Sequence, residues 1–270
     1  MRGWPLLLLL GGCSGQQPIA PGGIVSNNPC IDSVLAEIAA PEQIAAVSVY
    51  SHNANSASAP LGWARQLPAL GTGAEEIIAA KPRLVLTGNL ASSGTNAALT
   101  KAKVETVAVG VTTSVKDDLA QVRQIAKAIG RVEMGETLVR KIEFSKQPFP
   151  NAPSPSAIIW QNGGFVAGEG TLQDELLSLH GFANASKTYG LKSWDILPLE
   201  TLIRNPPDVI FMPATGKGSD ARQLSTRLKL LRHVAGKTKI VTFPDKLLFC
   251  GGPTTIKVSL IFSATRKALQ

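Results

Sequence analysis

The residues that usually carry out catalysis or bind metals are few in this sequence and widely separated. His52, His180 and His233 are the only histidines, and neither a His-x-x-x-His nor a Cys-x-x-Cys spacing occurs. Such spacings bring several ligands onto one metal ion, so the sequence predicts no metal centre. The Gly-x-Ser-x-Gly motif of a nucleophile elbow and the Walker loop are also absent. With no clustered acid, base or nucleophile, we expect a protein that is not an enzyme and has no cofactor.

Aromatic side chains are scarce, at 5% of residues, so those in predicted loops and at predicted strand ends stand out. A rigid ring in a loop can stack against a large flat or apolar ligand. Trp160 ends an apolar stretch and is expected in the core. The candidate ligand-binding residues are Tyr50, Trp63, Phe165, Trp194 and Phe249.

Two glutamates recur at equivalent places in a repeated unit. The stretches Ala74–Asn89 (AEEIIAAKPRLVLTGN) and Leu199–Ala214 (LETLIRNPPDVIFMPA) each predict a short helix, a proline stop and a buried strand. Glu75 in the first unit matches Glu200 in the second. A glutamate in the first turn of a helix stabilises the helix dipole and needs no other role. Alternatively, two exposed carboxylates in equivalent lobes grip arginines on a symmetric partner.

Strand and helix patterns alternate along the chain, which is typical of parallel sheets covered by helices on both faces. Four prolines in segment 148–155 (PFPNAPSP) mark the strongest boundary. We therefore predict two doubly wound α/β lobes with mostly parallel sheets, joined by a single bridging helix. The predicted lobes are residues 24–130 and 151–270, with the bridging helix and its linker at 131–150 and a leader with a flexible tether at 1–23.

Residues 1–13 (MRGWPLLLLLGGC) have the pattern of a short export signal, with one arginine, a leucine run, two glycines and then Cys13. The end of this segment is similar to a bacterial lipoprotein signal, in which the cysteine is lipidated. The alternatives are an ordinary cleaved signal and a plain apolar tail. No later stretch is long and apolar enough to span a bilayer. We expect a periplasmic protein that contacts a membrane only through a lipid on Cys13.

Export to an oxidising compartment permits a disulfide. If Cys13 carries a lipid, Cys30 and Cys250 are left as a candidate pair, 220 positions apart. The alternative is two separate buried thiols.

The basic residues give a formal net charge of +8, but they are scattered, with no run of five. A basic stripe with interleaved aromatic residues would indicate a nucleic-acid surface, and none occurs. The sequence therefore predicts a solvated basic surface and no nucleic-acid partner.

Four segments together resemble the periplasmic substrate-binding proteins of bacterial ABC importers for cobalamin and ferric siderophores. They are IVSNNPCIDSVLAEIAAPEQIAAVSVYS from Ile24, GTGAEEIIAAKPRLVLTG from Gly71, QNGGFVAGEGTLQDELL from Gln161 and LPLETLIRNPPDVIF from Leu197. Each motif is loose by itself, but their order and spacing are specific to this superfamily and cover nearly the whole mature chain. They do not specify the ligand.

The resemblance implies two lobes joined by one rigid helix, with the ligand in the cleft between them and little hinge motion. It also implies that Glu75 and Glu200 each dock onto arginines of an ABC permease in the inner membrane. The expected function is capture of a small metal chelate, a corrinoid such as cobalamin or a ferric siderophore, by a monomeric solute-binding protein. The alternatives are a non-transporting interaction lipoprotein and a binder of haem or another chelate on the same fold.

The resemblance also assigns part of the ligand site. Tyr50, Phe165 and Trp194 match aromatic positions that line the cleft of the cobalamin binder. A further cleft tryptophan of that protein falls near Ala69 or Leu70 here and is missing, and Trp63 from the longer loop is the candidate substitute.

Overall fold

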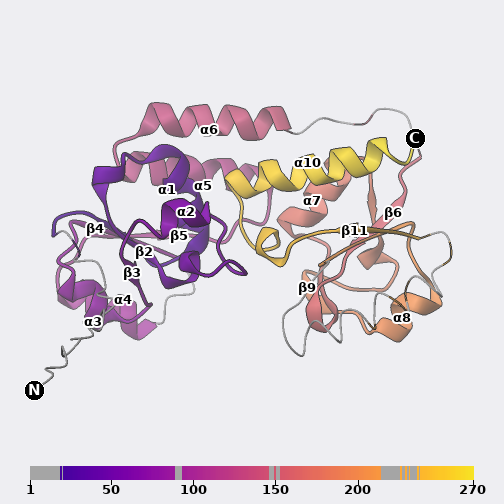
Figure 1. Ribbon diagram of the computed structural model, residues 1–270, viewed down its shortest axis with the longest axis horizontal. Helices are drawn as coiled ribbons and strands as arrows, with labels where there is room; N and C mark the ends of the chain where they lie inside the picture. The colour runs from indigo at the N-terminus through magenta and orange to yellow at the C-terminus, as the bar shows by residue number, and fades with distance from the viewer. Residues whose placement is uncertain are drawn as a thin grey trace, which may run out of the picture.

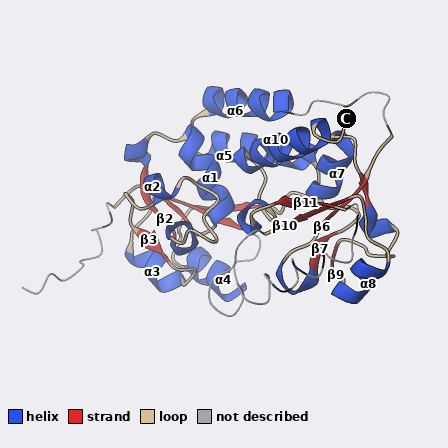
Figure 2. Cartoon of the chain, turned by 45° about the vertical axis from the view of Figure 1, so that its right-hand side comes forward, coloured by secondary structure: helices blue, strands red, loops and turns tan. Residues whose placement is uncertain are grey.

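The computed structural model describes residues 19, 21–88, 93–145, 149, 153–213, 226, 229, 231, 236 and 238–270. The chain forms two α/β lobes that lie side by side, with a layer of helices along the same face of both (Figures 1 and 2). The predicted lipidation site, Cys13, lies outside the described residues.

The N-terminal lobe contains a five-stranded sheet in the order β3-β2-β1-β4-β5. Every pairing in it is parallel, as predicted from the alternation of strands and helices. The strands are β1 (Ile24–Ser26), β2 (Ile44–Ser48), β3 (Ala69–Leu70), β4 (Leu84–Gly88) and β5 (Thr106–Val109). The α-helices are α1 (Pro29–Ile38), α2 (Leu61–Ala64), α3 (Ala74–Ala79), α4 (Ser93–Lys101), α5 (Val115–Ala128) and α6 (Val132–Ser145), and the short 3-10 helices are η1 (Pro41–Gln43) and η2 (Val49–His52).

The C-terminal lobe contains a four-stranded parallel sheet in the order β11-β10-β6-β8 and a separate antiparallel pair, β7 and β9. The strands are β6 (Ser156–Ile159), β7 (Phe165–Ala167), β8 (Ala183–Asn184), β9 (Trp194–Ile196), β10 (Val209–Met212) and β11 (Lys239–Thr242). The α-helices are α7 (Leu172–Leu179), α8 (Leu199–Arg204) and α10 (Pro253–Lys267), and the 3-10 helices are η3 (Asn162–Gly164), η4 (Ala185–Lys187) and η5 (Asp245–Leu247). The prediction of two α/β lobes with mostly parallel sheets is confirmed.

Neighbouring residues of each central strand pack into different cores, because successive side chains of a strand point to opposite faces. In β1, Ile24 belongs to a large core cluster and Val25 to a smaller one on the other face. In β6, Ile159 belongs to the same large cluster as Ile24, whereas Ile158 belongs to a third. One continuous core therefore runs beneath the helical layer and through both lobes.

The last helix, α10, starts against one lobe and ends against the other. Near its start, the backbone N–H of Gly252 and the Thr255 hydroxyl both donate to the buried carboxylate of Asp118 on α5, the latter over 2.6 Å. Near its end, the Arg266 guanidinium donates to the carbonyl oxygens of Pro153 at 2.8 Å and Gly181 at 3.2 Å in the C-terminal lobe. The helix also packs against α6, the helix expected to bridge the lobes. Helix α10 thus contributes to holding the lobes together (Figure 1).

Candidate ligand-binding site

Three of the five aromatic candidates form one cluster, which we call the aromatic trio: Phe165, Trp194 and Phe249. The rings of Phe165 and Trp194 are parallel, with an interplanar angle of 3° and centroids 5.4 Å apart. The Phe249 ring is 5.9 Å from Phe165 and 5.5 Å from Trp194, tilted by 37° and 36°. Phe249 is 57% exposed, so the trio presents an apolar ring surface to solvent.

Local backbone pairing explains how the trio forms. Phe165 is the first residue of β7, and Trp194 is the first residue of β9. The antiparallel register pairs Ala167 with Trp194 and Phe165 with Ile196, so the two rings lie on the same short ribbon. Phe249 reaches them from the segment after η5.

The trio borders the junction of the two lobes. Cys250, next to Phe249, forms a disulfide with Cys30 at the start of α1, with Cα atoms 5.1 Å apart. This bond joins the lobes covalently, beside one of the candidate ligand-binding rings. The pairing also answers the question left open by the sequence, because these two cysteines are not separate thiols.

The long loop between η2 and β3 also crosses the junction. The Ser58 hydroxyl lies 3.1 Å from Cys250 Sγ and 3.3 Å from the Lys246 carbonyl oxygen, and Lys257 Nζ donates to the Ser58 carbonyl oxygen over 3.4 Å. Ser58 is buried, together with its neighbours Ala57 and Ala59. The length of this loop suggested that it contributes to binding, but no feature of the sequence singled out Ser58.

Tyr50 lies on the other lobe, in the turn η2 directly after β2. Its side chain is 51% exposed. Proteins with parallel α/β sheets usually bind ligands at the carboxyl ends of the strands. Tyr50 lies at such an end, so its position suits a ligand-binding residue. Val49 on the same turn and Val111 after β5 are 47% and 57% exposed at the same edge of the sheet, and sequence reasoning missed both.

Trp63 does not join the trio. It lies in α2 and packs, partly buried, against the large core cluster. Among the described residues, no ring contact links Trp63 or Tyr50 to Phe165, Trp194 or Phe249. The predicted site is therefore divided in the structure into a cluster on the C-terminal lobe and separate residues on the N-terminal lobe.

Glu75 and Glu200 are exposed in the first turns of α3 and α8. These helices belong to different lobes and lie on the same face of the molecule, opposite the layer formed by α5, α6 and α10 (Figures 1 and 2). Their carboxylates could therefore contact one partner surface at the same time.

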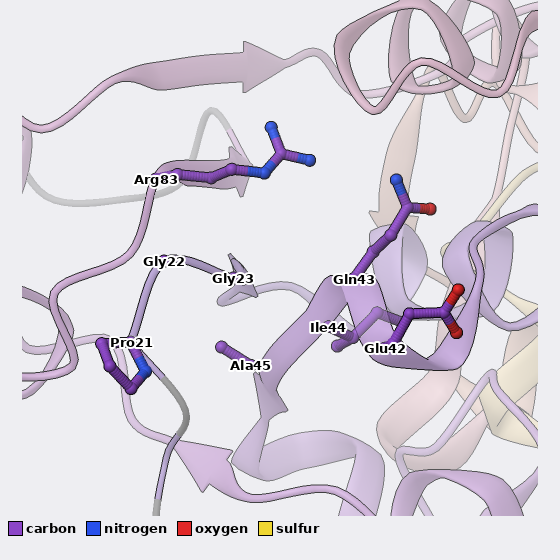
Figure 3. Close-up of a pocket in the computed structure, with 8 residues that line it drawn as sticks. All are labelled: Pro21, Gly22, Gly23, Glu42, Gln43, Ile44, Ala45 and Arg83. Atoms are coloured by element: carbon purple, nitrogen blue, oxygen red, sulfur yellow. The ribbon is translucent and has the colours of Figure 1, made fainter.

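A pocket of about 320 Å³ lies where strands of the N-terminal sheet begin, whereas Tyr50 follows the end of β2. Figure 3 shows the residues that line this pocket. Its walls are Pro21–Gly23, Glu42–Ala45 and Arg83, which precede or begin strands β1, β2 and β4. This is the amino end of the strands, where parallel α/β sheets seldom bind ligands. Across the described parts of the chain, three or more His, Cys, Asp or Glu residues never come together to hold a metal ion, and no helix is long and apolar enough to cross a membrane.

Comparison with known proteins identifies the family. A family model described as Periplasmic binding protein matches residues 24–233. This chain belongs to the periplasmic binding protein family. The resemblance to substrate-binding proteins of ABC importers for cobalamin and ferric siderophores is confirmed, and the family is one of binding proteins rather than enzymes. A search of curated proteins found no match.

Solved structures of other periplasmic binding proteins share the fold over almost the whole chain. The periplasmic heme-binding protein RhuT from Roseiflexus sp. RS-1, in apo form, is 22% identical with a TM-score of 0.72, over 92% of this chain and 100% of RhuT. The periplasmic heme-binding protein HutB of Vibrio cholerae is 18% identical with a TM-score of 0.71, over 92% of this chain and 98% of HutB. A periplasmic heme-binding protein from Pseudomonas aeruginosa is 18% identical with a TM-score of 0.68, over 91% of this chain and 92% of the other.

Proposed function

We propose that this periplasmic binding protein captures a flat metal chelate, heme or a corrinoid, between its two lobes and delivers it to an ABC permease. The aromatic trio at the lobe junction is the observation that carries the proposal, because a flat apolar ring surface suits a flat tetrapyrrole better than a globular, polar siderophore. Heme is the first ligand to test, since the similar structures described above are of heme-binding proteins. Membrane attachment through a lipid on Cys13 is part of the same proposal.

Titration of the chain from Gln16 onward tests the ligand class. The panel is heme, cobalamin, cobinamide and several ferric siderophores, followed by tryptophan fluorescence with inner-filter controls. We expect saturable quenching by heme or a corrinoid at about micromolar concentration or below, as for a preformed site. Saturation by siderophores alone would contradict the proposal.

Tyr50 is the candidate iron ligand if the chelate is heme, because a tyrosine phenolate can bind heme iron axially. Tyr50→Phe is expected to weaken heme binding by about 10- to 100-fold, which corresponds to the loss of one strong contact. The variant should also change the visible absorption spectrum of bound ferric heme. The matched control is Tyr189→Phe, the only other tyrosine, whose hydroxyl donates to the Asn205 carbonyl oxygen in the C-terminal lobe. Equal heme spectra for wild type and Tyr50→Phe would remove Tyr50 from the site.

Permease docking is tested by reversing the charges of Glu75 and Glu200. The double variant Glu75→Arg/Glu200→Arg is expected to reduce uptake in cells at least tenfold while ligand affinity is unchanged, because surface charges set docking rate and register. Glu133→Arg on α6 is the matched control, since it is exposed on the opposite helical layer. Unchanged uptake by the double variant would contradict docking through these residues and favour a lipoprotein that does not transport.

A further inference from the structure

A buried aspartate supports the turn that carries Tyr50. Asp32, on α1, is fully buried. Its Oδ2 accepts hydrogen bonds from the Ser48 backbone N–H at 2.9 Å and from the Ser51 hydroxyl at 2.6 Å. These residues flank Tyr50, and the Ser48 hydroxyl in turn accepts a hydrogen bond from the Tyr50 N–H at 3.3 Å. One carboxyl group therefore holds both sides of η2.

Within the described parts of the chain, no Lys, Arg or His side chain forms an ion pair with this carboxyl group. Asp32 Oδ1 is buried and meets no donor in good hydrogen-bond geometry among the described residues, although the Ser26 hydroxyl helps to lower the pKa of this carboxyl. The nearby strands β1, β2 and β4 contain no charged residue. Several charged groups on or beside the other elements packed against α1 have partners other than Asp32. They include His52 (carbonyl oxygens of Ala64 and Leu67), Arg65 (carbonyl oxygen of His52), Asp118 (Thr255), Arg123 (Glu136), Arg131 (carbonyl oxygen of Ile38), Lys141 (Glu37) and Lys257 (carbonyl oxygen of Ser58).

We propose that Asp32 is a positioning residue for Tyr50, and that loss of its proton loosens η2 and with it the ligand site. The proposal rests on the proposed function for the role of Tyr50, but the coupling between Asp32 and the turn stands on the hydrogen bonds alone. An ionised carboxylate sealed from water without a cation is costly, and opening the turn would hydrate it.

The direction of the pH effect follows from linkage. Burial raises the pKa of Asp32 from 3.8 to about 7, outweighing the hydrogen bonds that favour the ionised form. In an opened turn the carboxyl would be hydrated and regain its ordinary, lower pKa. The closed turn therefore binds the proton more tightly, so it is most stable at acid pH, loses stability as the pH rises toward 7, and changes little above that.

Amide hydrogen exchange of the ligand-free protein tests this coupling. After correction for intrinsic exchange rates, protection of the amides at 48–52 is expected to fall by roughly 100-fold between about pH 5 and about pH 8. Asp32→Asn keeps the size and hydrogen-bonding capacity but cannot ionise, so its protection at these amides should stay constant over the same range. The matched control is Asp118→Asn, an equally buried aspartate of the same lobe, whose carboxylate accepts hydrogen bonds from Gly252 and Thr255 at the start of α10. This variant should keep the wild-type pH profile at 48–52.

Heme affinity at the same pH values provides the second readout. The heme affinity of the wild type, divided by that of Asp32→Asn, should fall as the pH rises. The decrease should be at most the factor by which amide protection at 48–52 falls over the same pH range. A pH-independent protection of residues 48–52 in the wild type, or an identical profile in Asp32→Asn, would overturn the proposal. If no tetrapyrrole binds but the exchange profiles differ as expected, the proposed function fails and the coupling of Asp32 to the turn holds.

Discussion

Replacing Cys30 and Cys250 together by serine is expected to lower the free energy of unfolding by about 3–5 kcal/mol. The disulfide closes a loop of 220 residues, and so large a loop has much conformational freedom to lose in the unfolded chain. Urea unfolding of the variant, compared with oxidised and fully reduced wild type, measures the effect. The variant should match the reduced protein in midpoint and differ from the oxidised one.

The third cysteine provides the control for this experiment. In the full-length chain prepared without lipid, Cys13→Ser removes the third thiol and leaves both disulfide cysteines in place, so it should unfold as the wild type does. Indistinguishable unfolding of oxidised and reduced wild type would show that the bond contributes nothing to stability. Because Phe249 adjoins Cys250, we also expect reduction to weaken ligand binding, which the same samples can report.

Truncating the aromatic trio is expected to cause a large loss of binding. Trp194→Ala removes ring contacts to both Phe165 and Phe249, at 5.4 and 5.5 Å. It also removes the largest apolar surface of the trio, so we expect about a 10- to 100-fold rise in Kd for the tetrapyrrole, equivalent to roughly 1.4–2.8 kcal/mol. Isothermal titration or ligand absorbance should be used, because Trp194 is itself a fluorescent reporter.

A second pair of variants tests whether the ligand binds the aromatic trio specifically or any exposed apolar side chain. Phe249→Ala should also raise Kd, whereas Phe144→Ala should not, although Phe144 is the more exposed of the two at 79% against 57%. Phe144 lies at the end of α6, outside the trio. Equal affinity of wild type, Trp194→Ala and Phe249→Ala would mean that the ligand binds elsewhere.

The two-lobe α/β architecture could be predicted from the sequence because its signals are local. The apolar runs at Leu84–Leu86 and Val209–Phe211 follow proline stops, and they form the central parallel strands β4 and β10. Helix α1 begins where Pro29 follows Asn28, whose side chain accepts a hydrogen bond from the Cys30 N–H at 2.8 Å. The exact lobe boundaries at 130 and 150 remain predictions.

The site was predictable only as a set of separate residues. Phe165, Trp194 and Phe249 were each recognisable as aromatic residues in loops or at strand ends, but their contact depends on the register of β7 with β9 and on the path of the chain after η5. Trp63, which looks similar in the sequence, packs instead against the core. The sequence shows which residues are aromatic and how far apart they lie in the chain. Which aromatic rings contact each other depends on how distant segments pair in the fold.

The sequence by itself determined the alternation of strands and helices, the family and the repeated glutamates of α3 and α8, since each can be recognised from short segments and their order along the chain. Only the tertiary structure decided that Cys30 bonds to Cys250, that Ser58 reaches Lys246 and that Asp32 holds the turn around Tyr50. The first two contacts link residues 220 and 188 positions apart. Such contacts follow from how two completed lobes fit together, and no local periodicity or propensity encodes them.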